Sequence, residues 1–269
     1  MSHMTTTPLP AHLAARLDFA IRLVRQCGEL ALKEAAQLQI SAKGAHDVLT
    51  QADLAVEQLI RAEVAQAFAG DLVVGEEMGG QDAVGAAGNF WLVDPIDGTA
   101  NYATDVPRWC ISIGYLEAGK PVLGVLFDPL MDRLYSAGLG AGAWLNGRPM
   151  QARSTIALSG ATVELGWSPR SQPADYLGKA AALLSAGCAF TRRGSGALGL
   201  ADVAAGRVDG YAELHINAWD CAAGILLVTE AGGRANDFFT QQGIRSGGLL
   251  VACAADLYPA LLALMVHTP

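Results

Sequence analysis

The chain has 269 residues, of which 52% are hydrophobic and 16% are charged, so it can bury a core for one large domain or two closely packed halves. Its formal net charge of −8 at pH 7 argues against nucleic acid or an anionic membrane as its partner. The five cysteines lack C-x-x-C spacing, and their odd number favours reduced thiols and a cytoplasmic location over a disulfide framework.

Residues 1–4, Met-Ser-His-Met, have the form of a tag remnant, and we expect no signal peptide or membrane-spanning segment after them. Apolar residues at helical spacing predict two amphipathic helices, one over residues 13–24 and one over 56–68. The Asn146-Gly147 pair predicts a tight hairpin. Between the second helix and this hairpin, five short apolar runs predict a largely antiparallel sheet: 72–74, 90–93, 111–116, 122–127 and 134–136.

The second half of the sequence alternates between strands and helices, which is typical of an α/β arrangement. We therefore expect an N-terminal α+β half over residues 5–149, which carries the metal-binding motifs, and a C-terminal α/β half over 150–269, which selects the substrate. The predicted strands of the second half are 162–165, 189–191 and 208–212, and the predicted helices are 174–186, 197–205 and 220–231.

The most informative segment is the turn at 94–99, Asp-Pro-Ile-Asp-Gly-Thr, which directly follows an apolar strand. Pro95 fixes φ near about −65° and bends the chain, so two carboxylates and the Ile96 carbonyl can converge on one point. Convergent oxygens suit Mg²⁺. The backbone N–H groups of Gly98 and Thr99 can face a phosphate if a helix begins there. The alternative is that Asp-Pro and Asp-Gly are only turn dipeptides.

The spacing of the two aspartates in this turn excludes one class of phosphatase. Enzymes that form an aspartyl-phosphate carry the pattern D-x-D-G-T, whereas Asp94 and Asp97 are three positions apart with a proline between them. Glu76 follows its own predicted strand, so neighbouring strand ends can bring Glu76 and Asp94 together. Asp220 lies where a helix is predicted to begin, and it is either a metal ligand or a carboxylate that complements the helix dipole.

Three motifs closely resemble those of the inositol monophosphatase family, which contains Mg²⁺-dependent, lithium-sensitive phosphatases. They are residues 73–77 (VVGEE), 94–102 (DPIDGTANY) and 219–224 (WDCAAG), the last continuing to 230–233 (EAGG). The similarity spans roughly residues 43–233. It implies a layered α-β-α-β-α sandwich, hydrolysis of a small phosphate monoester, and, by analogy with relatives, a homodimer.

The resemblance also implies how the site binds two or three Mg²⁺ ions. The first ion is held by Glu76, Asp94 and the Ile96 carbonyl, and the second by Asp94, Asp97 and Asp220. Glu76 is implied to contact the third, weaker ion.

The resemblance further implies that Asp53 hydrogen-bonds Thr99 and that this pair orients a metal-activated water, so that no protein nucleophile is required. Asp53 has an alternative role, because Thr50-Gln51-Ala52-Asp53 has the pattern of a helix capping box. Both roles are compatible with the sequence.

Substrate selection is expected to involve the second half of the chain. Glu213 aligns with the family's acceptor for inositol hydroxyls, and the alternative is a solvated glutamate at a strand end. His215 lies nearby and is otherwise a turn or packing residue. Substrate-contacting positions are expected in the glycine-rich loop and around the metal site: Gly194, Ser195, Gly196, Asp97, Gly98, Thr99 and Asp220.

The predicted substrate is myo-inositol 1-phosphate or a related polyol phosphate. Histidinol phosphate, 3′-phosphoadenosine 5′-phosphate and fructose 1,6-bisphosphate are the alternatives on the same metal core. A non-catalytic regulatory protein is disfavoured, because all four metal-binding carboxylates are present: Glu76, Asp94, Asp97 and Asp220.

Overall fold

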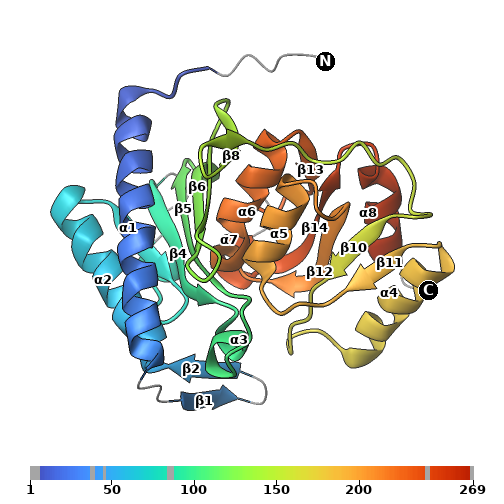
Figure 1. Cartoon of the computed structure of the whole chain (residues 1–269), viewed down its shortest axis with the longest axis horizontal. Coiled ribbons are helices and arrows are strands. Elements are labelled where there is room, and N and C mark those ends of the chain that lie inside the picture. Colours follow the sequence, from blue (N-terminus) through green and yellow to red (C-terminus); the bar gives the residue numbers. More distant parts are fainter. Residues whose placement is uncertain (1–6, 37–39, 45–46, 84–87, 240–242, 267–269) are drawn as a thin grey trace.

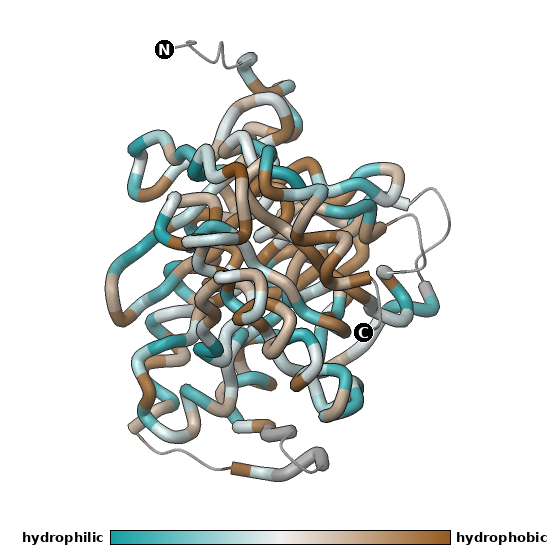
Figure 2. Tube along the Cα trace, turned by 90° about the vertical axis from the view of Figure 1, so that its right-hand side faces the viewer, coloured by the Kyte–Doolittle hydropathy of each residue, from teal (hydrophilic) through white to brown (hydrophobic). Residues whose placement is uncertain are grey.

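The structure is a computed structural model that describes residues 7–36, 40–44, 47–83, 88–239 and 243–266, so the predicted tag remnant at 1–4 lies outside it. Five layers alternate as α-β-α-β-α, which confirms the predicted sandwich (Figure 1). Figure 2 shows that hydrophobic segments concentrate in the interior and hydrophilic ones at the periphery.

The first helical layer consists of α1 (Ala11–Ala35) and α2 (Gln51–Ala67), which cover one face of a seven-stranded sheet. Both helices are amphipathic, and their apolar faces pack on Trp91 and Ile113 of that sheet. A two-stranded ribbon that the sequence did not predict, β1 (Ile40–Gly44) with β2 (Asp47–Thr50), precedes α2.

The seven-stranded sheet is antiparallel except for the parallel pair of its first two strands. Asn146 and Gly147 form the predicted tight turn before the last strand, with φ of 49° and 74°. In spatial order the strands are β3 (Leu72–Gly75), β4 (Phe90–Asp97), β5 (Cys110–Glu117), β6 (Lys120–Asp128), β7 (Arg133–Gly138), β8 (Gly142–Leu145) and β9 (Arg148–Pro149).

A second, five-stranded sheet is mixed: β10 pairs in parallel with β11 and β12, whereas β14 is antiparallel to both of its neighbours. The outer helical layer, α4 (Pro173–Ser185) and α8 (Tyr258–Val266), packs on this sheet. In spatial order the strands are β11 (Ala189–Thr191), β10 (Thr162–Leu165), β12 (Gly210–Ile216), β14 (Gly248–Ala254) and β13 (Gly233–Ala235).

The middle layer consists of α5 (Gly196–Ala204) and α6 (Ala218–Glu230), which lie between the two sheets. Both helices are apolar on nearly every side, as expected for helices that are covered on two faces. They approach each other closely, because a Cβ atom on Gly224 would lie 2.5 Å from the Leu200 side chain. The middle layer therefore joins the two sheets through one continuous core.

No described helix combines the length and apolar character needed to cross a membrane. All five cysteines are buried free thiols. Besides the β1–β2 ribbon, the elements that the sequence did not predict include four near the C-terminus: β13, β14, α7 (Gly243–Ser246) and α8.

Candidate metal centre and substrate pocket

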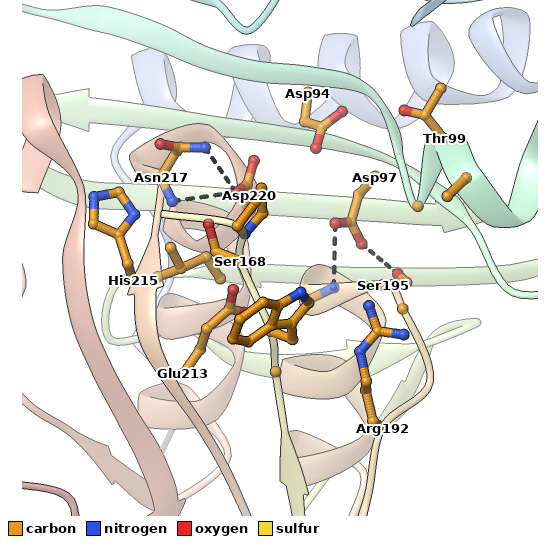
Figure 3. Close-up of a pocket in the computed structure, with 18 of the residues that line it drawn as sticks. Asp94, Asp97, Thr99, Ser168, Arg192, Ser195, Glu213, His215, Asn217 and Asp220 are labelled. Carbon is orange, nitrogen blue, oxygen red and sulfur yellow. Dashed lines mark hydrogen bonds between the residues drawn. The ribbon is translucent and has the colours of Figure 1, made fainter. Parts of the chain in front are cut away.

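One cavity of about 220 Å³ brings the predicted site residues together from both halves of the chain (Figure 3). Asp53 does not line this cavity, but every other predicted metal, catalytic or substrate residue does. These lining residues are Glu76, Asp94, Ile96, Asp97, Gly98, Thr99, Gly194, Ser195, Gly196, Glu213 and Asp220.

A β-bulge places Asp94 and Asp97 on the same side of the sheet. The predicted strand ended at residue 93, but β4 continues to Asp97. Asp94 pairs with Ser112 and Asp97 pairs with Cys110, so three steps along β4 match two along β5. In a regular strand, residues three apart point to opposite faces. The extra residue in β4 reverses that alternation and lets both carboxylates line the cavity.

Three carboxylates form a close group, because one ligand atom from each of Glu76, Asp94 and Asp220 lies within 4.8 Å of the others. Burial, followed by the charge of Glu76, raises the pKa of Asp94 well above its ordinary value. Burial, followed by the charge of Asp97, raises the pKa of Asp220 to about 8. A divalent cation would offset both the burial and the repulsion, so this donor set fits a metal ion.

The predicted contact between Asp53 and Thr99 is present. Asp53 Oδ1 accepts a hydrogen bond from the Thr99 hydroxyl at 3.1 Å. Asp53 Oδ2 accepts from the Thr50 backbone N–H at 2.8 Å and from its hydroxyl at 2.6 Å, so the capping box exists as well. The Thr99 oxygen also lies 2.9 Å from the Ile96 carbonyl, and its single proton can serve only one of these two acceptors at a time.

Glu57 supports the segment that carries Glu76, and the sequence analysis did not identify it. Its fully buried carboxylate accepts from the backbone N–H groups of Glu77 at 2.8 Å and Met78 at 3.1 Å. Arg61, one turn later on α2, donates to Glu57 at 2.9 Å. The spacing in the sequence could have identified Glu57. It follows Asp53 by four positions, so both acids lie on the same side of the helix, which faces the site.

The carboxylate of Asp97 contacts the start of α5 (Figure 3). It accepts hydrogen bonds from the Ser195 hydroxyl, from Ala197 N at 3.0 Å and from Gly196 N at 3.2 Å. Burial raises its pKa, and these three bonds oppose the rise. The amides of the glycine-rich loop thus already bind a carboxylate, as expected at a helix N-terminus. The role of Asp97 as a metal ligand stays a prediction.

Glu213 is a buried residue of β12, with 7% of its surface exposed, so it is not a solvated strand-end glutamate. Its carboxylate accepts a hydrogen bond from the Tyr211 hydroxyl. Burial raises its pKa to about 7, although the bond from Tyr211 opposes the rise. His215, on the same strand, hydrogen-bonds through Nε2 to the Ser246 carbonyl at 2.9 Å. That bond orients the imidazole at the cavity wall.

An ion-pair network around two buried carboxylates links the two halves beside the cavity, and sequence reasoning did not identify it. Arg108, which precedes β5, and Arg193, in the glycine-rich loop, each pair with both Glu164 and Asp202. Asn101 Nδ2 donates to the backbone carbonyls of both arginines, at 2.8 Å and 2.9 Å. These contacts fix the loop that presents Ser195 to Asp97. Their residues are far apart in sequence, so no local pattern marks them.

Comparison with known proteins agrees with this geometry. The model of the inositol monophosphatase family matches residues 12–267. A Pseudomonas aeruginosa protein named Nus factor SuhB is 34% identical over 262 residues, which cover 94% of this chain and 97% of that protein. A Mesorhizobium japonicum protein named inositol-1-monophosphatase is 36% identical over 231 residues, which cover 85% of this chain and 86% of that protein.

The fold is also similar to a solved structure. The inositol monophosphatase from Anabaena superposes with a TM-score of 0.83 at 31% sequence identity, and the match covers 96% of this chain and 98% of that structure. The sequence motifs, the five-layer fold and these relatives agree with one another: the chain belongs to the inositol monophosphatase family.

Proposed function

We propose that the protein is a Mg²⁺-dependent phosphomonoesterase that hydrolyses a small polyol phosphate, with myo-inositol 1-phosphate as the leading candidate. The proposal rests on the close group of Glu76, Asp94 and Asp220 in a cavity that also contains Thr99. Magnesium bound by these carboxylates would neutralise the phosphate and lower the pKa of an attacking water. The family and the relative named inositol-1-monophosphatase support this reaction class.

The chain's own residues contribute position and proton handling. The Thr99 hydroxyl can donate its hydrogen bond to Asp53, which leaves the lone pairs of Thr99 Oγ1 available to a water in the cavity. The water is thereby aligned for attack on phosphorus, and the barrier falls because its orientation is fixed in advance. Glu213 faces the same cavity and can accept hydrogen bonds from substrate hydroxyls when it is ionised. No side-chain nucleophile is needed.

A substrate panel tests this proposal. Phosphate release is measured in Mg²⁺ with myo-inositol 1-phosphate, fructose 1,6-bisphosphate, histidinol phosphate and 3′-phosphoadenosine 5′-phosphate. We expect myo-inositol 1-phosphate to give the highest kcat/KM of the four. A higher value for any of the other three compounds would contradict the inositol assignment, and no turnover of any of the four would contradict phosphatase activity itself.

A further inference from the structure

Another cavity lies away from the substrate cavity and is larger. Its volume is about 850 Å³, whereas that of the substrate cavity is about 220 Å³. Phe90, the first residue of β4, lines the larger cavity, and Asp97, the last residue of the same strand, lines the smaller one. At about 3.3 Å per residue these two positions are roughly 20 Å apart. The two cavities share no described lining residue, so the substrate site does not account for the larger one.

The larger cavity, which we call the apolar cavity, is lined mainly by hydrophobic side chains. Its walls are the turn between β5 and β6, the second half of α6, and the segment that runs from β13 to α7. The rings of Phe238 and Phe239 pack edge to face in this segment, with centroids 5.3 Å apart. A cavity of this size and character is typical of small-molecule sites. Its main apolar side chains are Phe90, Ile225, Leu226, Phe238, Phe239 and Ile244.

The charge of the apolar cavity is opposite to that of the whole chain. The chain has a net charge of −8, but two of the charged lining residues are basic, Lys120 at the start of β6 and Arg245 in α7. Both are exposed, and neither forms a hydrogen bond or ion pair with any residue in the described part of the chain. Asp237, the acidic residue of the lining, already has a partner of its own. Two available cations therefore lie at the rim.

We propose that the apolar cavity binds a small amphipathic anion, a carboxylate attached to an apolar chain. The chain packs against the phenylalanines and α6, where it leaves water. The carboxylate stays at the rim, where Lys120 and Arg245 supply charged donors. A second copy of this protein is a poorer occupant, because a two-fold contact would bring two more cations to the same rim.

Isothermal titration calorimetry on the full chain at constant ionic strength tests this inference with three probes. Octanoate has both the charge and the chain, 1-octanol lacks the charge, and butyrate lacks most of the chain. We expect octanoate to bind saturably, with one molecule per chain. 1-Octanol should bind at least about tenfold more weakly, the scale for a bond to a charged group. Butyrate should also bind at least about tenfold more weakly, because each buried methylene adds to the affinity.

Variants at exposed positions assign the binding to this cavity. Lys120→Gln combined with Arg245→Gln should lower the affinity for octanoate to that for 1-octanol, whereas Arg148→Gln, outside the cavity, should not change it. Leu139→Asp introduces an acid into the lining and should weaken both ligands by about tenfold or more. The matched control is Leu184→Asp on α4, outside the cavity, since Leu184 is 59% exposed and Leu139 is 56% exposed.

Four results would overturn the inference: no saturable binding of octanoate, equal affinity for octanoate and 1-octanol, unchanged binding in the double glutamine variant, or unchanged binding in Leu139→Asp. A smaller molecular mass for Leu139→Asp than for wild type in sedimentation equilibrium would also overturn it, because a second copy would then cover this surface. Failure of the proposed phosphatase activity would leave these results unaffected, since none of the substituted residues lines the substrate cavity.

Discussion

At the scale of single residues, the proposed alignment of the attacking water depends on how Asp53 fixes the Thr99 hydroxyl. One oxygen of Asp53 is held by Thr50, and the other accepts from Thr99. The carboxylate is fully buried, so it has no freedom to turn away. While the hydroxyl of Thr99 donates to Asp53, it can present its lone pairs to a water in only a few directions, which is the property that an orienting residue needs.

Thr99→Ala should lower kcat by about 10²-fold or more and change KM less, because the hydroxyl is proposed to position water rather than to bind substrate. Thr99→Ser keeps the hydroxyl and should keep most of the activity. Steady-state kinetics on myo-inositol 1-phosphate measure both effects.

Asp53→Asn should show a defect similar to that of Thr99→Ala, and the variant that carries both substitutions should lose much less activity than the two single losses added together. Additive losses would restrict Asp53 to its capping role.

Glu213→Gln should remove about 1–3 kcal/mol of transition-state stabilisation for myo-inositol 1-phosphate, because an amide replaces a charged acceptor. The kcat/KM for this substrate should fall accordingly. 4-Nitrophenyl phosphate has no hydroxyls, so the ratio of the two kcat/KM values reports the specificity of this contact. Damage to the metal site would lower both values together. A wild-type ratio in the variant would show that Glu213 does not bind substrate hydroxyls.

At the scale of secondary-structure elements, α2 supports the site at two points. Asp53 in its first turn holds Thr99, and Glu57 one turn later holds the backbone that follows Glu76. Because Asp53 and Glu57 belong to one rigid helix, α2 fixes the position of Glu76, the proposed metal ligand, relative to the hydroxyl of Thr99, which is proposed to orient the water. A displacement of α2 would disturb both together.

Glu57→Gln should weaken Mg²⁺ binding by about 10–100-fold, the range for residues that orient metal ligands without contacting the ion. The dependence of phosphate release on Mg²⁺ concentration measures this change. Glu63→Gln, on the same helix but outside the cavity, is the matched control. If Glu57→Gln and Glu63→Gln had the same half-saturating Mg²⁺ concentration, Glu57 would have no positioning role.

The sequence predicted elements with a strong local pattern, and it failed where pairing across the fold decides the structure. The amphipathic periodicity located α1 and α2, and Asn-Gly located its hairpin. The extension of β4 through Pro95 was not predicted, because the bulge that permits it depends on the register with β5. β14 was also missed, since a short apolar run fits either a strand or a buried helix.

The candidate site was predictable to the same extent. The motifs identified the carboxylates that converge in the structure, and the capping-box pattern identified Asp53. The network of Arg108 and Arg193 with Glu164 and Asp202 was not predictable, because four scattered charged residues carry no spacing signal. The contacts of Asp97 with the start of α5 likewise join residues about one hundred positions apart.

At the scale of the whole molecule, the middle helical layer fixes the cavity. α5 and α6 come from the second half of the chain but pack on the first sheet as well as on the second. The starts of these two helices bring Ser195 and Asp220 next to carboxylates of the first sheet. Burial of this acidic site has a cost, because like charges are held together in a low-dielectric environment.

The metal-free protein should lose stability as the pH rises. In the folded protein the pKa of Asp94 and Asp97 is raised, and that of Asp220 and Glu213 is raised to about 8 and about 7, in each case first by burial. The folded state therefore holds protons that the unfolded state has already released. The resulting stabilisation is complete below about pH 4 and is lost as the pH rises to about 8.

Thermal unfolding measures this effect. We expect the Tm in chelator to fall between about pH 5 and about pH 8, and the increase in Tm on adding Mg²⁺ to be larger at the higher pH, since the metal competes with protons for the same carboxylates. A Tm increase from Mg²⁺ that is independent of pH would show that the ion does not bind the buried cluster.

Phosphate release from myo-inositol 1-phosphate, followed as Mg²⁺ is titrated into chelator-stripped protein, tests whether the cluster of Glu76, Asp94 and Asp220 is the catalytic centre. We expect wild-type protein to be inactive without divalent metal and to gain activity as the ion is added. Asp94→Asn removes one charge with almost no change in volume, and it should remain about 10²-fold or more below wild type at every Mg²⁺ concentration. Full wild-type turnover in chelator, or a wild-type Mg²⁺ response in Asp94→Asn, would contradict the account.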